Sequence, residues 1–102
     1  MMAYPLRLNE KAQDEFSDAY FLYSMIRTNL ADKFMLCVEK RLLQISEYPE
    51  RYAKKHGNYR QVKVANFPYY IVYEFFKRKQ FIHIAAIYHG KRNPKKKYRR
   101  LR

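Results

Sequence analysis

The sequence predicts an α+β domain in the order β-α-α-β-β-β, with a helical hairpin packed on one face of an antiparallel sheet. Apolar residues recur every three or four positions along two stretches of the first half, as in amphipathic helices. The second half contains three stretches that alternate or are rich in aromatic and β-branched residues, as in strands. With 102 residues, 48% of them apolar, the chain is expected to form one domain over residues 1–90 and a basic tail over 91–102.

The first half predicts one short strand and two helices. Residues 3–8 form the strand, and Asn9 is a good N-cap for a helix over residues 10–27. The apolar face of this helix consists of Ala12, Phe16, Ala19, Tyr20, Tyr23 and Ile26. A tight break at residues 28–29 leads to a second helix, which ends at Pro49. Its apolar face consists of Leu30, Phe34, Val38, Leu42 and Ile45.

The second half begins with a polar segment over residues 49–58, which predicts a loop. Strands are then expected over residues 59–65, 69–77 and 81–89. The last is almost entirely apolar, as in a central strand that is covered on both faces.

Charge is distributed unevenly along the chain. Residues 1–50 carry a net charge of −2, residues 51–90 carry +7, and residues 91–102 carry +8, which together give +13. A surface built from the basic second half of the chain would bind an anion, so RNA, DNA or an acidic peptide would all qualify as partners. For Lys63 alone, an ordinary solvated surface lysine is an equally good interpretation. In residues 91–102, by contrast, eight like charges repel one another unless a partner neutralises them.

Several functional classes are excluded by composition. No apolar run is long enough to span a bilayer, and the N-terminus lacks the pattern of a secretory signal. Cys37 is the single cysteine, which excludes an internal disulfide and a cysteine-built zinc site and fits a reduced, cytoplasmic setting. It is expected to be a buried, inert thiol. We expect no metal, because the three histidines are scattered, and no cofactor, because the two glycines, Gly57 and Gly90, cannot form a phosphate-binding loop.

One sheet face is expected to remain free of helices. If Val62 and Val64 point toward the helices, Gln61 and Lys63 face away, and alternation in the next strand adds Tyr70, Val72 and Glu74. His83 reads as a hydrogen-bonded sheet histidine and His56 as exposed. His89 is better placed for chemistry, although the end of a strand explains it equally well.

Four segments, in order, resemble the toxins of the RelE/ParE superfamily, the toxic halves of type II toxin–antitoxin pairs. They are residues 48–52 (YPERY), 59–62 (YRQV), 67–73 (FPYYIVY) and 88–94 (YHGKRNP). The resemblance implies a cognate antitoxin as partner, a hetero-oligomeric complex, and either the ribosome with its mRNA or DNA gyrase as target. RelE-like members cleave mRNA on the ribosome, whereas ParE-like members inhibit gyrase.

The RelE pattern can be compared with this chain residue by residue. Lys63 and Arg92 match two of its basic positions, and Tyr98 matches by spacing, but Gln61 and Tyr70 replace cations. Under RelE-like cleavage, the resemblance implies Lys63, Arg92, Tyr98 and His89 as catalytic residues. The residues expected to bind nucleic acid or the target are Arg60, Lys63, Tyr70, Lys91, Arg92, Lys95, Lys96 and Lys97.

Because two cations are missing, we favour the ParE-like alternative, a non-enzymatic inhibitor of gyrase. A RelE-like ribosome-dependent endoribonuclease is the first alternative. A non-toxic nucleic-acid-binding module is the second.

Overall fold

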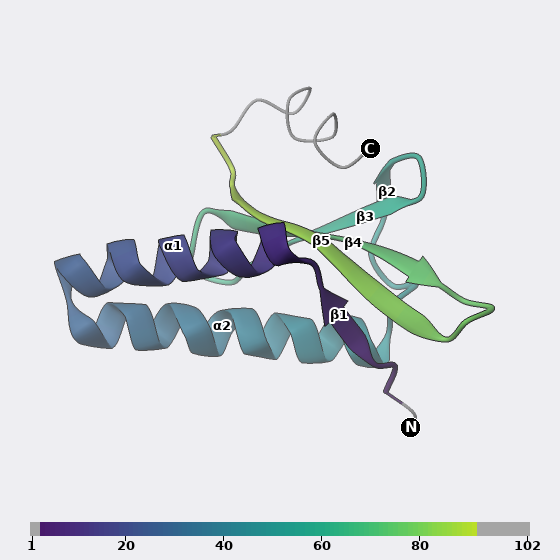
Figure 1. Ribbon diagram of the computed structural model, residues 1–102, viewed down its shortest axis with the longest axis horizontal. Helices are drawn as coiled ribbons and strands as arrows, with labels where there is room; N and C mark the ends of the chain where they lie inside the picture. The colour runs from purple at the N-terminus through teal and green to yellow at the C-terminus, as the bar shows by residue number, and fades with distance from the viewer. Residues whose placement is uncertain (1–2, 92–102) are drawn as a thin grey trace.

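The computed structural model describes residues 3–91, which form two helices and five strands (Figure 1). The elements in chain order are β1 (Leu6–Leu8), α1 (Glu10–Ile26), α2 (Thr28–Glu47), β2 (Lys54–His56), β3 (Tyr59–Lys63), β4 (Tyr69–Phe76) and β5 (Phe81–His89). The α+β class and the helical hairpin on one sheet face are therefore confirmed.

Both helices begin and end close to the predicted residues. The Asn9 side chain caps α1, since its Oδ1 accepts a hydrogen bond of 2.7 Å from the backbone N–H of Ala12. The predicted break at residues 28–29 is wrong, because the extended residue Arg27 alone joins the helices and α2 begins at Thr28. So short a connection makes the helices antiparallel neighbours.

The sheet has the strand order β1-β5-β4-β3-β2. Strands β2 to β5 pair antiparallel, as predicted, but β1 pairs parallel with β5, so the sheet is mixed. Strand β2 lies in the segment that was expected to be a loop. Its residues are all exposed, so it has no apolar alternation from which a strand could be predicted.

A β-bulge interrupts the pairing of β4 with β5. Val72 lies opposite Ala86, but the next residue of β4, Tyr73, lies opposite Ile84, which leaves Ala85 as the extra residue. The bulge reverses the alternation of β5, so that residues 82, 84 and 87 point to the helices. Residues 86–89 therefore face the opposite sides from those that uninterrupted alternation after residues 81–84 would give.

The core lies between the helices and the sheet and is centred on Phe34. This side chain is fully buried, and its ring lies within 5.7 Å of the ring centroids of Phe16, Tyr23, Phe67 and Tyr69. Cys37 is half-buried against this core, rather than buried as expected. No helix within residues 3–91 is long and apolar enough to cross a membrane.

A buried hydroxyl ties the sheet to the end of α2. Tyr73 Oη donates a 2.6 Å hydrogen bond to the carbonyl oxygen of Pro49, just beyond the helix. Burial raises the pKa of Tyr73 far above the usual value of a tyrosine, because the phenolate would lose its hydration. This hydrogen bond fixes the segment that leads from α2 into β2.

Candidate functional site

The sheet face turned away from the helices, here called the open face, is where the candidate residues from β3 and β4 lie. Cross-strand register and alternation place side chains of β1, β3, β4 and β5 on this face. Among them are Arg7, Tyr59, Gln61, Lys63, Tyr70, Val72, Glu74, Phe76, Phe81, His83, Ala86 and Tyr88. The placement of Gln61, Lys63, Tyr70, Val72 and Glu74 agrees with the alternation that the sequence predicts.

A small aromatic cluster covers the middle of the open face. Val72, Ala86 and Tyr88 are buried here although no helix of residues 3–91 lies above them, and the rings of Tyr59 and Tyr70 pack against them. The rings of Tyr70 and Tyr88 stack with centroids 5.6 Å apart and an interplanar angle of 20°. Burial of Val72 was not expected from the sequence, since it depends on rings contributed by neighbouring strands.

The two positions where the RelE pattern has cations belong to this cluster. Tyr88 Oη donates a 2.9 Å hydrogen bond to Oε1 of Gln61, while Tyr70 stacks on the same Tyr88 ring. Tyr70 also lies close to Gly90, where an added Cβ would be 2.9 Å from its Cε1. Gln61, Tyr70, Val72, Ala86 and Tyr88, here called the neutral cluster, therefore bring no positive charge to these positions.

Lys63 lies at the edge of the neutral cluster, opposite Tyr70. Its side chain is exposed, and Nζ donates to the carbonyl oxygens of Val64 at 3.2 Å and Phe67 at 3.0 Å. An ammonium has three N–H donors, so these contacts leave one for a phosphate or carboxylate oxygen. The arrangement suits Lys63 to binding an anion.

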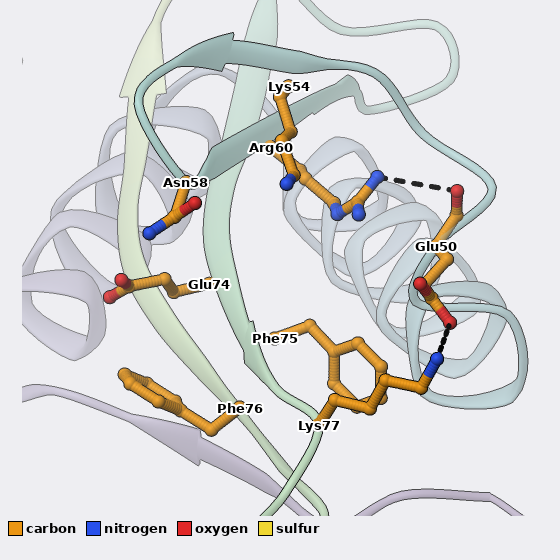
Figure 2. Close-up of a pocket in the computed structure, with 8 residues that line it drawn as sticks. All are labelled: Glu50, Lys54, Asn58, Arg60, Glu74, Phe75, Phe76 and Lys77. Atoms are coloured by element: carbon orange, nitrogen blue, oxygen red, sulfur yellow. Dashed lines mark hydrogen bonds and ion pairs between the residues drawn. The ribbon is translucent and has the colours of Figure 1, made fainter.

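Arg60 points to the helix side of the sheet, away from Lys63. Its Nη1 donates to the carbonyl oxygens of Tyr52 at 2.7 Å and Glu50 at 3.3 Å, and so supports the segment after α2. Figure 2 shows Arg60 beside Glu50, whose carboxylate pairs with Lys77 at 3.5 Å. Both charges of that pair are well exposed, so it adds little to stability.

His89 also points to the helix side. Its ring lies 5.3 Å from that of Tyr69 in an edge-to-face contact, and it lines a notch of about 130 Å³ together with Glu15 and Asp18. The Nδ1 atom accepts a 3.1 Å hydrogen bond from the backbone N–H of Lys91. The structure thus does not bring His89 to Lys63, because the bulge reverses the alternation of β5.

The remaining candidates lie at or beyond the end of the described chain. Lys91 is exposed in the turn after β5. Arg92, Lys95, Lys96, Lys97 and Tyr98 lie outside the described residues. Within residues 3–91, no group of three or more His, Cys, Asp or Glu side chains could hold a metal ion.

Comparison with known proteins identifies the family. Residues 6–94 match the family described as the ParE toxin of the type II toxin–antitoxin system parDE. The chain belongs to the ParE toxin family. No curated protein matches this toxin in sequence.

Solved structures with the same fold come from both branches of the superfamily. The chromosomal ParDE toxin–antitoxin system of P. aeruginosa has a chain that is 14% identical, with a TM-score of 0.75, and 87% of this toxin matches 98% of that chain. The isolated E. coli RelE toxin is 16% identical, with a TM-score of 0.61 over 98% of this toxin and 100% of RelE. A mutant of E. coli RelE in the free state is 17% identical, with a TM-score of 0.60 over 88% and 86% of the two chains. At these identities the similarity shows the fold alone.

Proposed function

We propose that this toxin acts as a ParE-like inhibitor of DNA gyrase and does not cleave mRNA through RelE-type positions. The neutral cluster is the observation that carries the proposal. Gln61 accepts a hydrogen bond from Tyr88, and Tyr70 stacks on the Tyr88 ring. The two positions where the RelE pattern has cations therefore carry neutral side chains that contact Tyr88.

The chemistry of RNA cleavage explains why this difference matters. Attack by a 2′-hydroxyl requires a group that takes its proton, cations beside the phosphoryl oxygens, and an acid for the leaving oxygen. Loss of one such cation costs about 3 kcal/mol of transition-state stabilisation. A surface that only has to bind a target has no such requirement, since it can bind with Lys63 and an aromatic face alone.

The proposed target-binding surface consists of the end of the open face near Lys63, together with the basic tail. Lys63, Tyr70 and Lys91 supply its described part, and residues 92–102 continue it along the chain. Arg60 supports the fold beside this surface through its hydrogen bonds to Glu50 and Tyr52. The tail is basic enough to add long-range attraction to an acidic partner.

A cognate antitoxin would neutralise the toxin by covering the helical hairpin and the basic sheet. The hairpin exposes large apolar side chains where α1 meets α2, and this end projects beyond the sheet (Figure 1). They are Phe21, Leu22, Met25 and Ile26, at the spacing of one helix face. An antitoxin with an apolar segment for this patch and acidic residues for the sheet would form a hetero-oligomer in the cytoplasm.

One observation favours the RelE-like alternative. Lys63 matches a basic position of that pattern and is exposed on the open face, as a residue that contacts RNA would be. A second cation from the tail, Arg92, would be needed beside it.

Two assays on the purified toxin separate these functions. In the first, gyrase, ATP and relaxed plasmid are incubated with increasing toxin, and supercoiling is followed on a gel. In the second, ribosomes programmed with a defined mRNA are incubated with the same toxin, and A-site cuts are mapped by primer extension. We expect supercoiling to stop and the A-site codon to stay intact; A-site cleavage with normal supercoiling would contradict the proposal.

A further inference from the structure

The end of the open face farthest from Lys63 carries an aromatic stack that no part of the proposed function uses. The rings of Phe76 and Phe81 lie face to face, with centroids 4.9 Å apart and an interplanar angle of 16°. The guanidinium of Arg7 covers Phe81 at 4.7 Å from the ring centroid. Phe76 is 36% exposed, so part of its ring surface is accessible to a ligand.

A polar pair adjoins this stack. Glu74 precedes Phe76 by two residues on the same face of β4, and His83 follows Phe81 by two residues on β5. Glu74 and His83 are direct cross-strand partners, and both are half-buried. Within residues 3–91, the Glu74 carboxylate makes neither a hydrogen bond nor an ion pair, so its oxygens remain available as acceptors.

A notch of about 250 Å³ opens beside these residues. Figure 2 shows the side chains of Asn58, Glu74 and Phe76 on one side of β4, whereas Arg60, Lys77 and the ring of Phe75 lie on the other. The first group combines an aromatic ring, an amide and an acceptor-only carboxylate. Such a set can stack on a flat ring and bind the hydrogen-bond donors on its edge.

We propose that this end of the open face binds a guanine base of single-stranded nucleic acid. The base stacks on Phe76, which is already stacked on Phe81, and Arg7 covers the Phe81 ring. Glu74 accepts hydrogen bonds from the guanine N1–H and N2–H groups, the one nucleobase edge that offers two adjacent donors. Arg7 provides positive charge for a neighbouring phosphate.

Single-stranded nucleic acid fits better than an acidic peptide. A peptide carboxylate would be repelled by Glu74, the single acidic residue of the chain after residue 50. A duplex would hide the Watson–Crick edge that Glu74 is placed to accept from. The site therefore differs in chemistry from the Lys63 end, which has no carboxylate.

The test measures binding of the full-length toxin to labelled oligonucleotides by fluorescence anisotropy at physiological salt. The oligonucleotides are single-stranded, of one length, and oligo(dT) except for a central G, A or T, so that backbone attraction is the same for all. A matched set in RNA distinguishes ribose from deoxyribose targets. We expect the central G to bind about tenfold more tightly than the central T.

Two variants assign the effect to the residues. Glu74→Gln keeps the shape but replaces one acceptor by a donor, so the preference for G should disappear while binding to oligo(dT) stays the same or strengthens. Phe76→Ala removes the stacking surface and should weaken binding to every sequence about tenfold.

Matched controls come from outside the site. Tyr48 is 37% exposed and lies beneath Arg51 at 4.3 Å, so Tyr48→Ala removes a comparable ring, and Glu39→Gln is the control for Glu74→Gln. Both controls should bind as the unaltered toxin does. Equal affinity for G and T in both backbones, a G preference that survives Glu74→Gln, or equal losses in Tyr48→Ala and Phe76→Ala would each overturn the proposal. If Phe76→Ala fails to fold, the isosteric Glu74→Gln variant decides.

The inference does not rest on gyrase inhibition, because these measurements contain no gyrase. A toxin that shows G preference without stopping supercoiling would retain this site and contradict the proposed function. A toxin that stops supercoiling but shows no G preference would support the proposed function and contradict this inference.

Discussion

The two faces of the sheet differ in how they are held together. On the helix side, apolar residues from every helix and most strands form one buried core around Phe34. On the open face, three residues are buried and the rest are half-buried or exposed polar and aromatic side chains. Substitutions on the helix side should therefore cost stability, whereas those on the open face should change what the toxin binds.

The largest effect is expected at the centre of the helix-side core. Phe34→Ala removes a fully buried ring that contacts four other aromatic rings. Substitutions of this kind lower the free energy of unfolding by about 3–5 kcal/mol. Urea unfolding followed by circular dichroism measures the loss.

A neighbouring position on the same helix provides the control. Leu36 is 62% exposed on α2, so Leu36→Ala should change the free energy of unfolding by less than about 0.5 kcal/mol. Similar losses in both variants would show that the core is not where the structure places it.

Removing one tyrosine hydroxyl from each face of the sheet compares how much a hydrogen bond on that face contributes to stability. Tyr73→Phe removes the buried hydrogen bond to Pro49 and leaves that carbonyl without its partner, at a cost of about 1–2 kcal/mol. Because burial raises the pKa of Tyr73, its contribution is present below pH ~10 and is lost as pH rises toward the folded-state value. The unaltered toxin should therefore lose stability above pH ~10 faster than Tyr73→Phe does, as thermal melts at several pH values would reveal.

Tyr88→Phe is the matched change on the open face. Its hydroxyl bonds the half-buried side chain of Gln61, which water can reach when the partner is removed. We expect a loss of about 0.5–1 kcal/mol in the free energy of unfolding. A larger loss than that of Tyr73→Phe would reverse the comparison between the two faces.

Much of the helix-side architecture could be predicted from the sequence. The positions of Phe34, Val38 and Ile45 follow a helical period, and Asn9 is a typical N-cap, because both signals are local. The faces of Lys63 and Tyr70 likewise follow from simple alternation in β3 and β4.

The details that arrange the site depend on contacts between distant residues. The bulge at Ala85 reverses one half of β5, and so places His83 on the open face and His89 on the helix side. Parallel pairing of β1 with β5 brings Arg7 beside His83 and over Phe81, although more than seventy residues separate them. No local pattern encodes either feature. The sequence contains one local signal for the arrangement of the site. Arg60 and Lys63 are three residues apart in one strand, so their side chains must lie on opposite faces of the sheet.

The most direct test of the central claim compares gyrase inhibition by two charge variants. Lys63→Gln removes an exposed cation from the proposed target-binding end of the open face, and Lys40→Gln removes an exposed cation of α2. Because a charged hydrogen bond contributes about 1.5–3 kcal/mol, Lys63→Gln should require at least tenfold more toxin to stop supercoiling, while Lys40→Gln should act like the unaltered toxin. Equal potency of both variants, or undiminished supercoiling with the unaltered toxin, would contradict the assignment of gyrase binding to the open face.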